Sequence, residues 1–304
     1  MGKIAFIFAG QGAQYSGMGE ELFAASPAAK TIFDFADTIR PGTASQCFSG
    51  SEEELSVTEN TQPCLYCVDL AAAMALTEQG IQPDYVAGFS LGEIAALTFS
   101  GIFSPKDGFQ FVCQRAKAMQ KAAEQNPGAM AAVLKLSNEQ VEELCASYEH
   151  VYPVNYNCPK QLVVAGEKAE LDSFMQKVGG LKGRAVLLKV SGGFHSPFMD
   201  SAAEELSSVL DSMELHEPNI PVYSNLDAKL YTAEEAKSRI TAQINHPVRW
   251  QSILEDMAEK GVDTFIEVGP GQTLSGLVKK TLKNVRVFSV QDKSGLDAVL
   301  NELK

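Results

Sequence analysis

Apolar runs of strand length alternate with longer stretches of helical character along the first part of the chain. KIAFIFA at 3–9 and DYVAGF at 84–89 predict short buried strands. Longer helices are predicted at 61–80, with Pro63 in the first turn, and at 104–125. Strands that alternate with helices favour a parallel α/β sheet.

The pattern changes after NPG at 126–128. The elements predicted beyond it are a strand at 129–136, a helix at 137–148, a hairpin of strands at 151–157 and 161–166, a helix at 167–180 and a strand at 184–190. A βαββαβ order within about seventy residues is a complete ferredoxin-like unit. We therefore expect an inserted subdomain at 128–190.

The first pattern resumes after the insert. Strands are predicted at 220–226, 263–269 and 285–290, and helices at 247–261 and 271–283. The expected fold class is thus α/β. A large α/β-hydrolase-like domain with a parallel sheet would be formed by 1–127 and 191–304, and it would carry the ferredoxin-like subdomain 128–190.

Composition and charge narrow the function classes. Of 304 residues, 45% are hydrophobic and 21% are charged, as in ordinary globular proteins. The net charge of -13 argues against a nucleic-acid-binding protein, because such proteins need a basic footprint. The N-terminus does not resemble a signal peptide, and no apolar run reaches the length of a membrane span. We expect a cytoplasmic enzyme that does not bind membranes.

Six cysteines are scattered through the chain, which is too few for a disulfide scaffold. Cys64 and Cys67 form a C-x-x-C motif, but no second pair of metal ligands follows at zinc-like spacing. We interpret them as buried core thiols, and no metal site is predicted.

Residues 88–92 fit the motif G-x-S-x-G between a predicted strand and a predicted helix. A serine on such a turn has the setting of a nucleophile elbow, which makes Ser90 a candidate nucleophile. The motif alone is weak, because it also occurs in lipases and thioesterases.

Only one of the four histidines has the surroundings of a proton acceptor. His195 follows a predicted strand and a Gly-Gly pair, and it adjoins Phe194. Its position suits either a catalytic base or a hydrogen-bonded core histidine. His150, His216 and His246 lie in polar or capping positions.

Arg115 interrupts the apolar stripe of the helix at 104–125. Positions 112, 116, 119 and 123 are apolar at helical spacing, and Arg115 falls among them. A buried guanidinium needs a partner, since an unpaired buried charge is costly. The partner would be either an internal Asp or Glu or the carboxylate of a substrate.

Eight sequence blocks occur in the order found in one enzyme family. They are FAGQGAQYSGMG, TQP, GFSLGEIAAL, RAKAMQ, NYNCPKQLVVAG, GGFHSP, NHPVRW and EVGPGQTLSGL, between residues 8 and 277. The chain thereby resembles malonyl-CoA:acyl carrier protein transacylases and the acyltransferase domains of fatty acid and polyketide synthases.

The resemblance implies a Ser-His dyad with Ser90 as nucleophile and His195 as general base. It implies that the backbone carbonyl of Gln243 orients the imidazole. The oxyanion hole would be formed by the backbone N–H groups of Gln11 and Leu91. These assignments suit the chemistry, because a neutral imidazole needs its second N–H accepted and an oxyanion needs fixed donors.

The resemblance also implies that Arg115 holds the malonyl carboxylate. Phe194 matches the malonyl-selective pattern, in which a bulky side chain leaves no room for an α-methyl group. Asn155 and Asn157 either line the pocket or satisfy local backbone. Phe89 departs from the family, which usually has histidine there, and this puts the rate and the acyl preference in question.

The expected reaction is ping-pong transfer of malonyl from coenzyme A to the phosphopantetheine thiol of an acyl carrier protein. No cofactor is expected, because coenzyme A is substrate and product. The alternatives are a serine hydrolase acting on acyl thioesters and a silent docking subunit. We expect a monomer. The sequence leaves open whether the carrier serves fatty acid or polyketide synthesis.

Two basic groups are candidates for docking the acidic partners. One comprises Lys279, Lys280, Lys283 and Arg286, and the other Lys182, Arg184 and Lys189. Each could equally be a solvated face, as most charge runs are.

Overall fold

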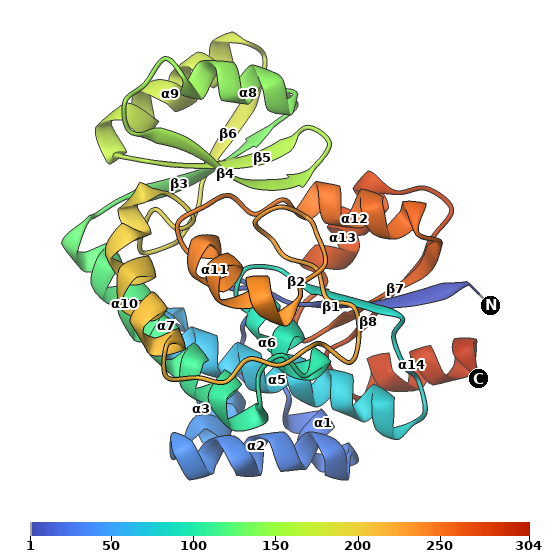
Figure 1. Cartoon of the computed structure of the whole chain (residues 1–304). Helices are drawn as coiled ribbons and strands as arrows, with labels where there is room; N and C mark the ends of the chain where they lie inside the picture. The colour runs from blue at the N-terminus through green and yellow to red at the C-terminus, as the bar shows by residue number, and fades with distance from the viewer. Residues whose placement is uncertain (1) are drawn as a thin grey trace.

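Two four-stranded sheets organise the chain, as Figure 1 shows for a computed structural model that describes residues 2–304. The first is parallel, in the order β2-β1-β7-β8, with β1 at Lys3–Phe8, β2 at Tyr85–Gly88, β7 at Val262–Val268 and β8 at Arg286–Val290. The second is antiparallel, in the order β4-β5-β3-β6, with β3 at Ala129–Leu134, β4 at Val151–Cys158, β5 at Gln161–Gly166 and β6 at Arg184–Leu187.

Helices cover both sheets. Those of the large part are α1 Glu20–Ala25, α2 Pro27–Ile39, α3 Thr43–Ser49, α4 Glu52–Ser56, α5 Thr58–Glu78, α6 Leu91–Ser100, α7 Pro105–Gln125, α10 Asp200–Leu210, α11 Ala233–Gln243, α12 Trp250–Glu259, α13 Thr273–Thr281 and α14 Lys293–Leu303. Those of the second sheet are α8 Asn138–Cys145 and α9 Lys168–Gly180. No helix within residues 2–304 is long and apolar enough to cross a membrane.

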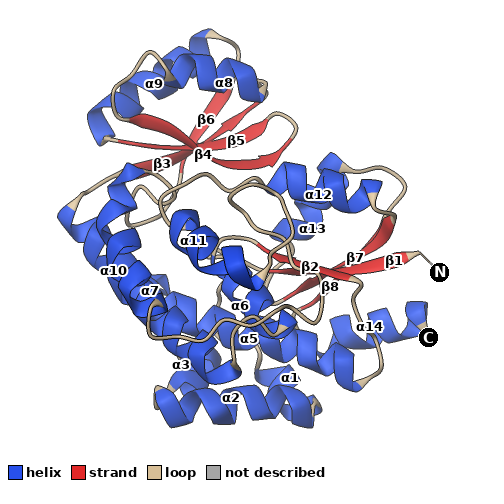
Figure 2. Ribbon diagram, viewed as in Figure 1, coloured by secondary structure: helices blue, strands red, loops and turns tan. Residues whose placement is uncertain are grey.

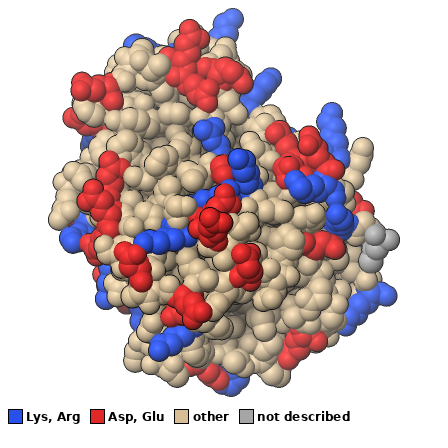
Figure 3. Space-filling model, viewed as in Figure 1, with Lys and Arg blue, Asp and Glu red and all other residues tan. Residues whose placement is uncertain are grey.

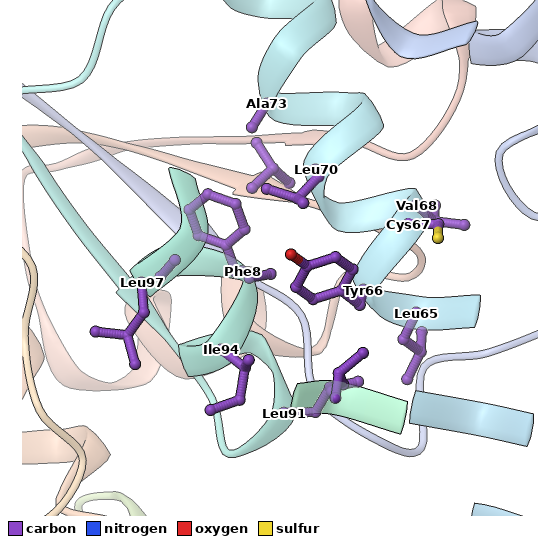
Figure 4. Packing of buried hydrophobic residues seen from close by; sticks show 14 of the residues in the cluster. Phe8, Leu65, Tyr66, Cys67, Val68, Leu70, Ala73, Leu91, Ile94 and Leu97 are labelled. Carbon is purple, nitrogen blue, oxygen red and sulfur yellow. The ribbon is translucent and has the colours of Figure 1, made fainter. Parts of the chain in front are cut away.

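The central strand β1 is buried on both faces, because the helices that connect the strands of a parallel sheet cover both sides of it. Phe6 and Phe8 point into one core, and Ala5 and Ile7 point into the other. Figure 4 shows Phe8 among Leu70 of α5 and Leu91, Ile94 and Leu97 of α6. The opposite face packs on α12 and α13 through side chains such as those of Trp250 and Leu274.

The second sheet has the strand order of a ferredoxin-like unit, and α8 and α9 cover its outer face (Figure 2). Its edge strand β4 is joined to the rest of the chain by hydrogen bonds from Tyr156 N to Val248 O (2.9 Å) and from Val248 N to Val154 O (2.8 Å). The predicted α/β fold with an antiparallel subdomain is therefore confirmed. The domain limits 128 and 190 themselves stay a prediction.

Two local predictions were wrong. Helix α5 begins at Thr58, so Pro63 lies inside the helix rather than in its first turn. The segment 220–226 forms only isolated bridges, of which Val86–Val222 adds two backbone hydrogen bonds at the edge of β2. Pro221 has no N–H to extend that pairing. The cysteine prediction was right, since Cys64 and Cys67 are free and buried.

Candidate active site

Ser90 occupies a strained turn between β2 and α6, with φ 55° and ψ -99°. Glycine is required at positions 88 and 92 because neighbouring backbone lies too close to leave room for a side chain. A Cβ on Gly88 would lie 1.9 Å from the backbone of Gly92, and a Cβ on Gly92 would lie 2.2 Å from the carbonyl oxygen of Phe8. The sequence G-x-S-x-G thus lets α6 pack tightly on β1 and presents the serine at the turn.

Asn225, which is distant in the sequence, stabilises this turn through two hydrogen bonds. Its Oδ1 accepts a hydrogen bond from Ser90 N (2.7 Å), and its Nδ2 donates to Gly88 O (2.7 Å). The sequence analysis did not identify Asn225, because no motif or spacing links it to the serine. The segment predicted as a strand at 220–226 serves instead to hold the elbow.

Ser90, His195 and Gln243 form a chain of hydrogen bonds. Ser90 Oγ lies 2.7 Å from His195 Nε2, and His195 Nδ1 lies 2.8 Å from the carbonyl oxygen of Gln243. The carbonyl can only accept, so Nδ1 carries the proton and Nε2 of the neutral ring is free to accept from Ser90. This geometry suits a serine nucleophile with a histidine base.

His195 is buried, with 3% of its surface exposed. Burial, and secondarily the positive charge of Arg115, lowers its pKa to about 4. This value lies well below the ordinary histidine pKa of about 6.5. A lowered pKa keeps the imidazole neutral, and able to act as a base, well below neutral pH.

This lowered pKa predicts an unusual pH profile. Acylation of Ser90 by acetyl-CoA, which has no acyl carboxylate, should stay nearly constant from about pH 8 to about pH 6 and fall only as His195 protonates toward its pKa of about 4. Rapid-mixing measurement of the acylation rate across pH tests this. A midpoint near pH 6.5 would contradict the buried, cation-flanked setting of His195.

Arg115 is fully buried on α7, and its guanidinium contacts only uncharged groups. It donates to Gln62 Oε1 (2.8 Å), Gln243 Oε1 (3.1 Å) and Ser90 Oγ (3.3 Å). Its Nε has no partner, and no carboxylate within residues 2–304 lies within 4.0 Å of the group. Burial lowers its pKa only to about 10, so it stays charged at neutral pH.

The internal salt bridge considered for Arg115 is thus not formed in this structure. A buried cation with an unused donor next to the candidate nucleophile has the charge and the hydrogen-bond donor that an anionic group would need. Gln62, in the TQP block, is a contact that the sequence analysis did not assign.

Two adjoining cavities lead to Ser90. The inner one, about 100 Å³, is lined by Gln11, Phe89, Ser90, Met119, Met130, Asn155, Leu188, Val190, Phe194 and His195. The outer one, about 220 Å³, shares Gln11, Phe89, Asn155 and Leu188 with it and extends between the two sheets to Asn157, Gln161 and α13. The inner space is mostly apolar and has room only for a short acyl group.

The other residues singled out from the sequence surround these cavities. Phe194 lines the inner cavity, Asn155 lines both and Asn157 lines the outer one. The Oδ1 atoms of both asparagines are buried without a hydrogen-bond partner within residues 2–304, so local backbone does not satisfy them. Phe89 lines both cavities and packs edge-on against Trp250, with ring centroids 5.5 Å apart.

The two residues expected to supply oxyanion donors flank the serine. Gln11 follows β1 and lines both cavities. Leu91 is the first residue of α6, where a backbone N–H has no partner inside the helix.

Away from these cavities, one group of side chains within residues 2–304 has the spacing of metal ligands. It comprises His150, Glu167 and Glu170, near the start of α9. None of the three lines either cavity, and the chemistry around Ser90 has no part for them.

Comparison with known proteins agrees with this arrangement. The acyl transferase domain family matches residues 5–297. A malonyl CoA-acyl carrier protein transacylase of Bacillus subtilis is 40% identical, with 100% of this chain and 98% of that protein covered. The crystal structure of a transacylase of the same name from Clostridium perfringens superposes with a TM-score of 0.96 at 38% identity, covering 99% of this chain and 97% of that one.

A third similar structure is a malonyl-transacylase in complex with a type II polyketide synthase acyl-carrier protein, with a TM-score of 0.95 at 34% identity and 99% of each chain covered. The resemblance suggested by the eight sequence blocks thus extends over the entire chain and over both sheets. With its Ser90–His195 pair set between those sheets, the chain belongs to the malonyl CoA-acyl carrier protein transacylase family.

Proposed function

We propose that the protein transfers a malonyl group from coenzyme A to an acyl carrier protein through a malonyl ester of Ser90. The observation that carries the proposal is the buried guanidinium of Arg115, which has no carboxylate partner among the described residues 2–304 and donates to Ser90 Oγ at 3.3 Å. A carboxylate on a short acyl group bound at Ser90 would lie within reach of this cation.

In the first half-reaction His195 removes the proton from Ser90 Oγ, which attacks the thioester carbon. The bond between that carbon and the sulfur of coenzyme A breaks as the tetrahedral intermediate collapses. The thiolate leaves and takes the proton from His195. The Gln243 carbonyl, 2.8 Å from Nδ1, holds the ring and stabilises the imidazolium while it carries the proton.

In the second half-reaction the phosphopantetheine thiol of the carrier replaces coenzyme A. His195 takes the thiol proton, the sulfur attacks the ester carbon, and the proton returns to Ser90 Oγ as the ester bond breaks. Each half-reaction forms an oxyanion at the same place. We assign its stabilisation to the backbone N–H groups of Gln11 and Leu91.

The alternative is a hydrolase that releases the acyl group to water. A mostly apolar inner cavity of about 100 Å³ restricts water beside the ester and favours transfer to a thiol. With labelled malonyl-CoA and a holo carrier protein, label should accumulate on the carrier faster than free malonate appears. Release of malonate that outpaces carrier labelling would support the hydrolase instead.

Replacement of Arg115 by alanine should change which acyl group is used. Malonyl transfer should fall by about thirtyfold to several thousandfold, the factor expected when a buried charge loses its counter-charge. Acetyl transfer should persist or improve, because a methyl group needs no cation. Transfer rates of both acyl groups for wild type and variant, with a melting curve for each, test this. Equal losses for both acyl groups together with a lower melting temperature would make Arg115 structural.

This protein has a net charge of -13, and Figure 3 shows acidic and basic side chains interspersed on one face. Because the partners are acidic as well, docking needs a local basic surface. We favour the group of Lys279, Lys280, Lys283 and Arg286. Lys280 Nζ donates to Gln161 Oε1 (3.1 Å), and Gln161 lines the outer cavity. The position of Lys280 beside the outer cavity supports this choice. Function as a monomer stays a prediction.

A further inference from the structure

Gln243 connects the three groups of the proposed reaction. Besides its carbonyl bond to His195, its side-chain Oε1 accepts from Arg115 (3.1 Å) and its Nε2 donates to the carbonyl oxygen of Ser90 (2.8 Å). If this amide were turned over, its NH₂ group would face the guanidinium, donor against donor. Gln62 holds Nη1 of Arg115, so the direction of the Gln243 amide decides whether Nη2, the nitrogen that also donates to Ser90 Oγ, keeps its acceptor.

Glu93 lies behind that amide. It is fully buried on α6, and its Oε2 accepts from Gln243 Nε2 at 3.0 Å. Its Oε1 accepts from the hydroxyl of Tyr231 and from Asn225 N (3.3 Å). Donors converge on both oxygens, and an ionised carboxylate accepts from all of them without presenting a donor of its own.

We propose that Glu93 is the positioning residue that keeps Gln243 Oε1 turned toward Arg115 and so keeps the guanidinium aimed at the carboxylate of the acyl group. The inference rests on the proposed function, in which that carboxylate binds Arg115. Glu93 touches neither the side chain of Ser90 nor that of His195 and acts through Gln243. Its negative charge also favours the charged form of Arg115 against the effect of burial.

The same geometry predicts a pH dependence of selectivity. Burial raises the pKa of Glu93 to about 7, although bonds from Tyr231, Gln243 and Asn225 and the charge of Arg115 oppose the rise. A proton on Glu93 Oε2 places a donor against Gln243 Nε2, which then loses the acceptor that fixes its direction. The titratable groups that face Glu93 are Tyr231, whose pKa burial raises, and Arg115, with a pKa of about 10, and neither changes form near neutrality.

The test is the ratio of malonyl to acetyl acylation of Ser90 in wild type and in Glu93→Gln. A glutamine has one acceptor oxygen, and the two donors Tyr231 and Asn225 N favour that oxygen on their side, which turns the new NH₂ group toward Gln243 Nε2. The ratio should therefore fall about tenfold to a hundredfold, as when one buried polar partner is left unsatisfied. Asp69→Asn is the matched control. It makes the same change at a fully buried acid of α5 that has no hydrogen-bond partner within residues 2–304, and it should leave the ratio unchanged.

Wild type provides a second measurement that needs no variant. Its ratio should decline as the pH is lowered from about 8 to about 6, a range in which a substrate carboxylate stays ionised. Glu93→Gln should show no such decline. Combined with Gln243→Leu, Glu93→Gln should lower the ratio no further than Gln243→Leu alone, because the two residues act in one path.

A folded Glu93→Gln protein with the wild-type ratio, or a flat pH dependence in wild type, would overturn the inference. Loss of both activities in equal proportion would also overturn it, since it would make Glu93 merely structural. A wild type without any preference for malonyl would instead contradict the proposed function. If Arg115→Ala loses the preference while Glu93→Gln keeps it, the proposed function stands and only the role of Glu93 is lost.

Discussion

Replacement of Ser90 by alanine should abolish covalent acylation and lower acyl transfer by on the order of 10⁴-fold or more, because the nucleophile has no substitute at the turn. In the described part of the chain its Oγ forms hydrogen bonds with His195 and Arg115 only, and Arg115 keeps its bonds to Gln62 and Gln243 without it. The fold should therefore remain intact. Transfer assays and intact-protein mass after exposure to malonyl-CoA measure the loss.

Ser208→Ala, at an exposed position of α10, is the control for the serine change and should behave as wild type. An acylated Ser90→Ala protein that turns over at the wild-type rate would remove Ser90 from the mechanism. Inactivity caused by unfolding would appear in the melting curve.

Replacement of His195 by alanine should lower transfer by several orders of magnitude, because nucleophile and base act as a unit. The loss should be similar for malonyl and acetyl groups, unlike the loss in Arg115→Ala, since proton transfer is common to both. Rates of Ser90 acylation with each thioester measure it. A loss of rate of equal size for both acyl groups distinguishes a general base from a residue that only binds the acyl group.

His216→Ala is the matched control, since His216 is exposed and outside both cavities. It should leave the acylation rate unchanged. A loss in His195→Ala of less than about tenfold would be too small for a general base, which typically contributes 10²–10⁴-fold.

The parts of the site that the sequence predicts are those with a local signature. Ser90 is marked by glycines whose Cβ atoms could not fit, and Arg115 by a charge inside an apolar stripe. The surroundings of His195 single it out among the four histidines but leave it open whether it is a base or a core histidine. Only the resemblance indicates the base and the role of the Gln243 carbonyl. The Gln243 side chain, which contacts Arg115, was not predicted.

Residues that act across long sequence separations were missed. Glu93 accepts hydrogen bonds from Asn225 and Tyr231, which lie 132 and 138 positions away in the sequence. Ser90 N donates to Asn225, 135 positions away. Such pairs depend on tertiary folding and leave no periodic pattern. Helix α11 escaped prediction for a related reason, since it buries Arg239 and Gln243 where an apolar stripe would be expected.

The central claim is a malonyl ester on Ser90 that a carrier thiol can discharge. The direct measurement is intact-protein mass after mixing with malonyl-CoA, followed by mapping of the modified peptide and addition of a holo acyl carrier protein. The account predicts one malonyl adduct on Ser90 that disappears as an equal amount of malonyl-carrier forms. An adduct on another residue, no adduct at all, or an adduct lost to water without reaching the carrier would contradict it.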